Sequence, residues 1–242
     1  LVIGAAFLFP AAVARADTPP AGSPGSDGPA VAVGPPAADS VVRLAPGVFR
    51  VGHVTIDANS REVVMPGEVN MSRGPVELLA CTRYGKTHES VFSVDAQPYH
   101  IQVGLLLLGL EVTNKPLRSQ GDPAKPTGSP VSVVVAWHDS TGKLVQVPGE
   151  DAVLDLRTRR PMPRGPWVFV GSTITDGVLD AQSQGNIIAT LHDPATIIDN
   201  PRAGAGDDTI YSVNSALVPA VGTPITITLR ALKNTHPSPA HK

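Results

Sequence analysis

Residues 84–110 read YGKTHESVFSVDAQPYHIQVGLLLLGL, and the rest of the chain is organised around them. The second half of this stretch predicts a helix, because Asp95 suits the N-cap position and Pro98 falls in the first turn, where its missing N–H is harmless. Gly109 is a residue that commonly ends a helix. The sequence therefore predicts a helix at about residues 96–108.

Four consecutive leucines, Leu105–Leu108, make the predicted helix apolar on every side. A helix without a polar face is typical of a protein core. At about 13 residues, this helix is also too short to cross a bilayer. We therefore expect it to be buried at the centre of the domain.

Alternating apolar and polar residues predict strands on both sides of this stretch. His53–Asp57 and Arg61–Pro66 flank an Asn-containing turn, as the two strands of a β-hairpin do. Further strands are predicted at residues 76–82, 131–137, 167–172, 209–214 and 223–232. The predicted fold class is therefore α+β, with mainly antiparallel β strands packed around one central buried helix at about residues 96–108.

A long loop is predicted at residues 114–130, which contain four prolines and two glycines. At about 17 residues it is long for a connection without regular structure. We expect either a mobile flap or a simple excursion over the surface.

The chain divides into four predicted regions. Residues 1–16 are typical of a signal peptide, because Leu1–Phe9 is apolar and Ala14-Arg15-Ala16 fits the small-x-small rule for cleavage before Asp17. No Met or basic segment precedes the apolar part, so we expect the start of this signal to be truncated in the printed sequence. Residues 17–39 are expected to form a disordered Pro/Gly linker, residues 40–232 a single domain and residues 233–242 a flexible tail.

These features predict an exported protein, periplasmic or extracellular, without a transmembrane span in the mature chain. The formal net charge is −2 and the basic residues are scattered, which argues against nucleic-acid binding. Cys81 is the only cysteine, so the chain cannot form an internal disulfide or ligate an iron–sulfur cluster by itself. It lies in a predicted strand, where we expect a small buried side chain.

Lys86, His88, Glu89 and Ser90 are the candidate catalytic residues, because they place a base, a carboxylate and a hydroxyl close together. A strand is predicted at Thr87–Val94, in which His88 and Ser90 would share one face and Glu89 would point the other way. A triad drawn only from these neighbours is therefore geometrically poor, and His88 would need a carboxylate from elsewhere in the fold. The alternative is that the cluster ties the strand to neighbouring backbone or caps the following helix.

A divalent metal is a weaker alternative. His88, His100, His192 and Asp193 have side chains that bind zinc and related ions. They are widely separated in the sequence, and no HExxH motif accompanies them. We therefore expect ordinary structural roles for these four residues, and we predict no cofactor.

The chain resembles the YdjY-like domain. The likeness is carried by the block from Val76–Leu79 to Lys86-Thr87-His88-Glu89-Ser90 and by the leucine run Leu105–Leu110, and it extends over about Val41–Leu232. The resemblance implies an exported bacterial protein without an established biochemical activity. Some members are described as ferredoxin-like, and this chain departs from that description because one cysteine cannot hold a cluster.

Two functions are left open. The first is a non-enzymatic exported domain that binds a protein partner or a small ligand in the cell envelope, which the low charge and the missing catalytic signature favour. The second is a hydrolase or a metal-assisted enzyme centred on His88 and Glu89. An open pocket that holds both side chains, with another His or Asp in hydrogen-bond reach, would favour the enzyme.

Overall fold

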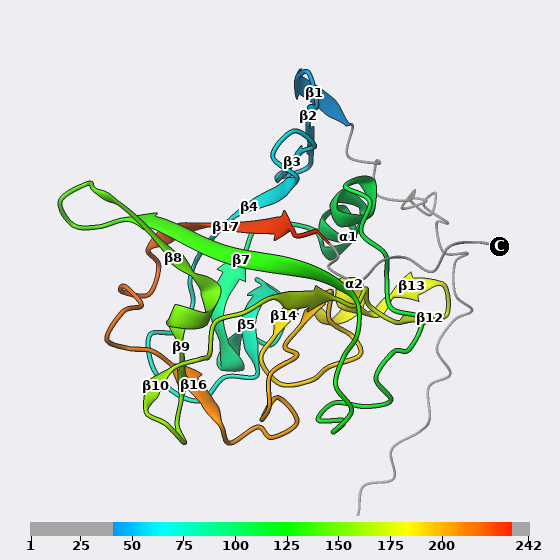
Figure 1. Cartoon of the computed structure of the whole chain (residues 1–242). Helices are drawn as coiled ribbons and strands as arrows, with labels where there is room; N and C mark the ends of the chain where they lie inside the picture. The colour runs from blue at the N-terminus through cyan, green and yellow to red at the C-terminus, as the bar shows by residue number, and fades with distance from the viewer. Residues whose placement is uncertain (1–40, 234–242) are drawn as a thin grey trace, which may run out of the picture. The chain divides into compact units, whose positions relative to one another are not determined.

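The computed structural model describes residues 41–233, which form a mainly β structure (Figure 1). The predicted signal peptide 1–16, the predicted linker 17–39 and all of the predicted tail except Lys233 lie outside these residues. Within residues 41–233, no helix combines the length and the apolar character needed to cross a membrane.

Eight strands close into a barrel. The strands pair in a continuous circuit, and the last of them, β6, returns to pair with β4. Pairing is antiparallel around the circuit except for β5–β6 and β14–β15, which are parallel. In spatial order the barrel strands are β4 (Glu62–Val69), β17 (Pro224–Ala231), β7 (Ser129–His138), β11 (Trp167–Phe169), β15 (Ile198–Asp199), β14 (Asn186–Ala189), β5 (Leu78–Thr82) and β6 (Ser90–Val94).

Strand β4 closes the barrel because one of its edges serves two partners. Its residues Glu62–Val64 pair with β3 (Val54–Asp57), and its residues Gly67–Val69 pair with β6. A Cβ atom at Gly67 would lie 2.5 Å from the backbone oxygen of Ser93 in β6. The absence of a side chain at Gly67 therefore allows the close approach that closes the barrel.

The remaining strands add to the barrel at its sides. β3 continues through β2 (Val48–Val51) to β1 (Val42–Ala45), and these three strands project from the barrel as the β1–β3 extension (Figure 1). The other elements are β8 (Leu144–Pro148), which pairs with β7, the sheet of β10 (Arg160–Pro161), β9 (Val153–Asp155) and β16 (Tyr211–Val213), the pair β12 (Ile174–Thr175) and β13 (Val178–Leu179), helices α1 (Pro98–Leu107) and α2 (Asp180–Gln184), and 3-10 turns η1 (Thr87–Glu89) and η2 (Gly149–Ala152).

The side chains of the strands fill the core. Along β7, buried and partly exposed residues alternate, as expected for a strand with one face turned inward. Trp167, Phe92 and Phe169 are among the largest fully buried side chains. Cys81 is also buried and free, and burial raises the pKa of its thiol. The prediction of a small buried side chain at this position is confirmed.

The prediction of an α+β fold around a central helix is wrong. Helix α1 forms close to the predicted residues 96–108, but it packs against β3 and β4 at the side of the barrel (Figure 1). One of its faces, with Ile101 and Leu105, is buried, whereas Leu107 is 69% exposed. A small closed barrel is filled by the side chains of its own strands, which leaves no space for a helix at its centre.

Two local predictions have different outcomes. The predicted hairpin is confirmed, because β3 and β4 pair antiparallel across the turn at Ala58–Ser60. The strand predicted for Thr87–Val94 is shorter than expected, because Thr87–Glu89 form a 3-10 turn and β6 begins at Ser90. This difference changes which side chains of the polar cluster can meet.

Gly67→Ala tests the closure of the barrel. The new methyl group would collide with the backbone of Ser93, so we expect the free energy of unfolding to fall by about 1–3 kcal/mol. Urea titrations of the two proteins would measure the change. Gly206→Ala is the matched control, because its Cβ would meet nothing closer than 3.5 Å. An equal effect of both substitutions would show that the close approach at Gly67 does not matter.

Candidate functional site

The polar cluster predicted from the sequence forms an ion-pair network around Lys86. The 3-10 turn η1 has three residues per turn, so residues three apart lie on the same side. Lys86 Nζ accordingly lies 3.2 Å from Glu89 Oε1, and it also lies 3.1 Å from Oε2 of Glu77, which precedes β5. We call these three residues the Glu–Lys–Glu cluster.

Protonation in the Glu–Lys–Glu cluster is shifted by burial and by the neighbouring charges. Partial burial and the hydrogen bond with Glu77 raise the pKa of Glu89, against the lowering effect of Lys86. Burial alone would lower the pKa of Lys86, but the hydrogen bonds and charges of Glu77 and Glu89 raise it above its usual range. One ammonium group therefore holds two carboxylates together.

The predicted loop at 114–130 is anchored to this cluster and to the segment between β14 and β15. Gln120 Nε2 donates a hydrogen bond to Glu77 Oε2, and Lys86 Nζ lies 3.4 Å from Gln120 Oε1. The backbone N–H of Gly121 donates to the carbonyl oxygen of His192 at 2.8 Å. The loop is thus an excursion fastened to the barrel at these points.

His88 and Ser90 do not join the Glu–Lys–Glu cluster as catalytic partners. The side chain of His88 is 79% exposed, and its Nε2 lies 3.9 Å from Glu89 Oε2. Ser90 is fully buried, and its hydroxyl donates to the carbonyl oxygen of Phe92 at 2.9 Å. The hydroxyl is therefore turned into the core, away from any substrate.

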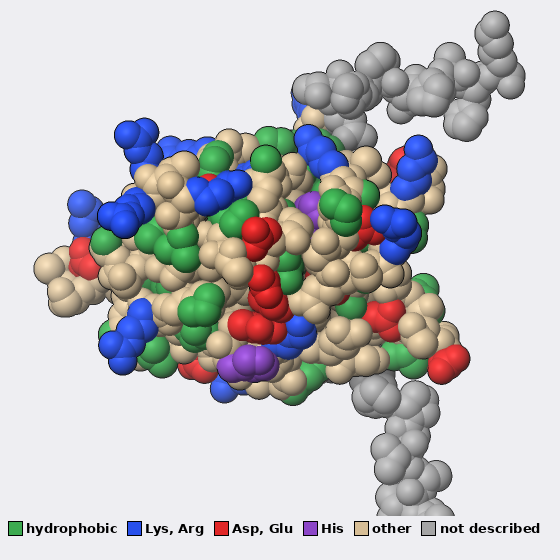
Figure 2. Space-filling view, turned by 90° about the horizontal axis from the view of Figure 1, so that it is seen from below, with side chains coloured by type: hydrophobic (Ala, Val, Ile, Leu, Met, Phe, Trp, Pro, Cys, Tyr) green, Lys and Arg blue, Asp and Glu red, His purple; other side chains and the backbone are tan. Residues whose placement is uncertain are grey.

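An open, largely polar hollow of about 540 Å³ lies beside the cluster. Its lining includes Glu77, Gln120, Asp207 and Asp208, but neither His88 nor Glu89. Figure 2 shows a row of Asp and Glu side chains on the face of the molecule that is seen from below, with one His and one basic side chain beside it. Of the Glu–Lys–Glu cluster, Glu77 lines this acidic hollow, whereas the catalytic candidates Lys86, His88, Glu89 and Ser90 do not.

The four candidate metal ligands are not brought together. Within residues 41–233, no group of three or more His, Cys, Asp and Glu side chains could hold a metal ion. His88 lies on η1 and His100 on α1. His192 is buried, and its Nδ1 and Nε2 lie 2.7 Å and 2.9 Å from the carbonyl oxygens of Asp122 and Asn200. Neither ring nitrogen of His192 is left for a metal.

Asp193 has a structural environment of the same kind. Its carboxylate accepts hydrogen bonds from Asn186 Nδ2 at 2.7 Å and from the backbone N–H of Ala195 at 2.8 Å. Burial raises the pKa of Asp193, and it raises the pKa of the neighbouring, fully buried Asp199 still more. These contacts hold the segment between β14 and β15 in place.

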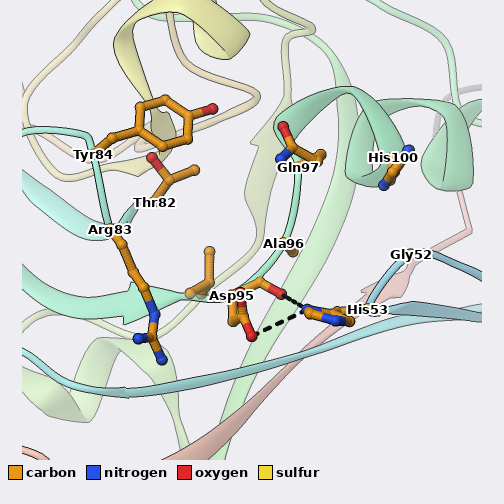
Figure 3. A pocket seen from close by; sticks show the side chains of 10 residues that line it. Gly52, His53, Thr82, Arg83, Tyr84, Asp95, Ala96, Gln97 and His100 are labelled. Carbon is orange, nitrogen blue, oxygen red and sulfur yellow. Dashed lines mark hydrogen bonds and ion pairs between the residues drawn. The ribbon is translucent and has the colours of Figure 1, made fainter. Parts of the chain in front are cut away.

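A second site, which the sequence did not indicate, lies at the start of α1. It is a polar pocket of about 270 Å³, shown in Figure 3. His53 and Asp95 lie against each other on one side, Thr82 and Tyr84 lie on another, and α1 contributes its first turn (Figure 3). The charged and polar side chains that line it include His53, Arg83, Tyr84, Asp95, Gln97 and His100.

His53 is oriented in this pocket by Asp95. Its Nδ1 lies 3.0 Å from the Asp95 carboxylate and 3.1 Å from the Asp95 carbonyl oxygen, so Nδ1 carries a hydrogen that it donates to Asp95. These two residues are 42 positions apart in the sequence, and only the pairing of β4 with β6 brings them together. No local motif could have predicted the pair.

Helix α2 fixes the other side of the pocket through Gln182. The side chain of Gln182 donates to Gln97 Oε1 and lies 3.2 Å from the Tyr84 hydroxyl. Its Oε1 accepts the backbone N–H of Tyr99 at 3.2 Å, and its carbonyl oxygen accepts the Tyr84 hydroxyl at 3.0 Å. Tyr84 and Gln97 are therefore held in place before any ligand arrives.

An apolar groove of about 530 Å³ adjoins the polar pocket. One wall is the β1–β3 extension and the segment beside it, with Val41, Phe49, Val51, Ile56 and Ala58. The opposite wall is α1, with Tyr99, Val103, Leu107 and Leu108. His100 lines both the groove and the pocket, so the two hollows meet at this residue.

The sequence did not predict the groove, because Leu107 of α1 was expected to be buried and is exposed. The leucine run predicted burial on every side of the helix, whereas the structure turns part of the run toward the groove. Large apolar side chains that stay exposed beside a concave surface are a typical sign of a binding site. The leucine run is visible in the sequence, but its exposure is not, because the opposite wall of the groove lies about 50 residues earlier in the chain.

Comparison with known proteins gives one match. A family model described as the YdjY domain matches residues 54–230 of the chain. No curated protein and no solved structure shows a significant match. The matched region includes the whole barrel except the last residue of β17, the Glu–Lys–Glu cluster and helix α1.

Lys86→Met tests whether the Glu–Lys–Glu cluster is held by its one positive charge. At pH 7 the substitution leaves two carboxylates facing each other, and we expect the free energy of unfolding to fall by about 1–2 kcal/mol. The pKa of Glu89 is raised in the folded protein, so Glu89 takes up a proton as the pH falls through that pKa. The repulsion between the two carboxylates then disappears, and the loss of stability caused by Lys86→Met becomes smaller.

Urea titrations at pH 7 and pH 4 would measure this difference. Lys143→Met is the matched control, because Lys143 is exposed on the hairpin between β7 and β8, and we expect a change of about 0.5 kcal/mol or less at both pH values. An equal loss at pH 7 and pH 4 for Lys86→Met would contradict a charge-based role.

Proposed function

The chain belongs to the YdjY domain family, and we propose that it is an exported, non-enzymatic domain that binds a ligand in the cell envelope. Export is supported by the apolar Leu1–Phe9 and by Ala14-Arg15-Ala16 before Asp17. Binding is supported by one observation above all, the apolar groove that meets a polar pocket at His100.

The dimensions and the lining of this joined site fit a small-molecule site. Such sites are concave, mostly apolar and several hundred Å³ in volume, with a few fixed polar groups. The groove supplies the apolar surface, and the pocket supplies polar groups that Asp95 and Gln182 hold in position. No other hollow described here combines the two properties.

The alternative of a hydrolase or metal-assisted enzyme at His88 and Glu89 has less support. Glu89 is engaged by Lys86, and the exposed His88 lies too far from Glu89 for a hydrogen bond at 3.9 Å. The Ser90 hydroxyl is buried and donates to backbone. The nearby hollow is lined by neither His88 nor Glu89. A nucleophile with an adjacent base is therefore missing from this cluster.

A groove-filling variant tests the proposal. We expect the fluorescent probe anilinonaphthalene sulfonate to bind the native protein saturably, because it joins an apolar ring system to a polar group. Val103→Trp fills the groove from the α1 wall and should weaken probe binding by about tenfold or more. Fluorescence titration would give both dissociation constants, and circular dichroism would show that the fold is intact.

Leu144→Trp is the matched control for this titration. It adds the same indole at an exposed position on β8, outside the groove, and should leave probe affinity unchanged. Equal affinities for Val103→Trp and the native protein would refute binding in the groove.

His88→Ala separates the two proposed functions. Because His88 lines neither the groove nor the pocket, we expect its loss to leave probe affinity within about twofold of the native value. The same titration measures the change. A large loss of affinity would instead place the binding site at His88 and would support the alternative of an enzyme centred on His88 and Glu89.

A further inference from the structure

We propose that the ligand of the joined site is a fatty carboxylate, with its hydrocarbon chain in the apolar groove and its carboxylate in the polar pocket. This inference rests on the proposed binding function and names the chemistry of the ligand. It follows from the change in polarity along the site, from the scarcity of hydrogen-bonding side chains in the groove and from the positive charge of Arg83 at the polar end.

The polarity of the site changes once along its length. On the α1 side, Tyr99, Val103, Leu107 and Leu108 line the groove, Gln97 lines the pocket, and His100 lines both. Across from it, Val51 belongs to the groove, whereas the next residues, Gly52 and His53, belong to the pocket. A ligand with one apolar end and one polar end matches this arrangement.

The groove offers very few partners for a polar chain. Among its lining side chains, only Tyr99 and His100 carry polar atoms. A peptide laid in the groove would bring an N–H and a carbonyl group with every residue, and burying them without partners costs free energy. A hydrocarbon chain has no such groups and gains free energy with every methylene removed from water. The groove therefore favours an alkyl chain over a peptide.

The pocket supplies positive charge for an anionic head group. Arg83 has an ion-pair partner, Glu68, only at 4.0 Å, and its side chain is 62% exposed, so the guanidinium can turn toward a ligand. Asp95 is the acidic residue among those lining the pocket, and it is engaged by His53 Nδ1. Arg83 can hold a carboxylate with two parallel hydrogen bonds.

Around the proposed head group, the pocket also holds polar side chains in fixed positions. With Nδ1 committed to Asp95, the opposite nitrogen of His53, Nε2, is available to a ligand. Tyr84 and Gln97 are both held by Gln182 of α2. A fixed frame lowers the entropy that must be lost when the ligand binds.

A second copy of this chain is the rival occupant. Val42 and Leu44 are exposed on β1, whose outer edge is unpaired among the described strands. Such an edge can add a strand from another molecule. This rival predicts self-association and no preference for alkyl chain length, so the same experiment distinguishes the two occupants.

Isothermal titration calorimetry with octanoate, decanoate and dodecanoate, all below their micelle-forming concentrations, tests the proposal on the full chain. We expect the affinity to rise about three- to fourfold for each added methylene. Arg83→Gln should weaken decanoate binding about tenfold and leave decanol binding unchanged, because only the carboxylate needs the guanidinium. Arg73→Gln, an exposed position outside the site, is the matched control and should change neither affinity.

Several outcomes would overturn the inference. Affinities that do not depend on chain length, together with retained binding of anilinonaphthalene sulfonate, would reject the fatty carboxylate and leave the proposed function standing. Loss of both kinds of binding would reject both proposals. An equal effect of Arg83→Gln on decanol and decanoate would reject the placement of the head group. Sedimentation that shows a dimer dissociated by Val103→Trp, without decanoate binding, would assign the groove to a second copy.

Discussion

Strand β4 divides one of its edges between two partners, and the architecture of the domain depends on this division. Before Pro66 the edge pairs with β3, and from Gly67 onward it pairs with β6. The first pairing sends the β1–β3 extension outward, and the second closes the barrel. The same division brings His53, directly before β3, against Asp95, directly after β6. The polar pocket and one wall of the groove are therefore products of barrel closure.

The sequence predicted local structure well and long-range structure poorly. Alternation around the turn at Ala58–Ser60 was enough to predict the β3–β4 hairpin, because both strands and their turn are local. The helix at 98–107 was also predictable from Pro98 and Gly109, although its N-cap residue is Gln97 and not the expected Asp95. Its position on the barrel was not predictable, because a run of apolar residues does not show which surface of the protein will cover it. The pairing of β6 with β4 and the parallel pairing of β5 with β6 were not predictable, because neither segment has a sequence feature that identifies its partner strand.

The candidate site shows the same limit. In the predicted strand, His88 and Glu89 would have pointed to opposite faces. The structure has a 3-10 turn instead, which brings Lys86 and Glu89 together. Their partners Glu77 and Gln120 come from other segments. The motif by which the chain resembles its family therefore stabilises the fold around β5, β6 and the loop at Gln120. The hollow to which we assign ligand binding lies elsewhere, beside α1, where the side chains are mostly aliphatic. Ordinary aliphatic residues give no motif, so a binding surface of this kind becomes visible only when its two walls are folded together.

Within residues 41–233, strands β1 and β2 have no partner in the barrel, so the extension can open while the barrel stays folded. Opening would separate the extension from α1 and remove one wall of the groove. Amide hydrogens of β1 and β2 would then exchange with solvent faster than those of β7 and β17, which are paired on both sides within the closed circuit. A molecule held between the extension and α1 would slow exchange in β1 and β2 alone. Binding in the groove would thus raise the local stability of β1 and β2, although these strands contribute little to the global stability of the domain.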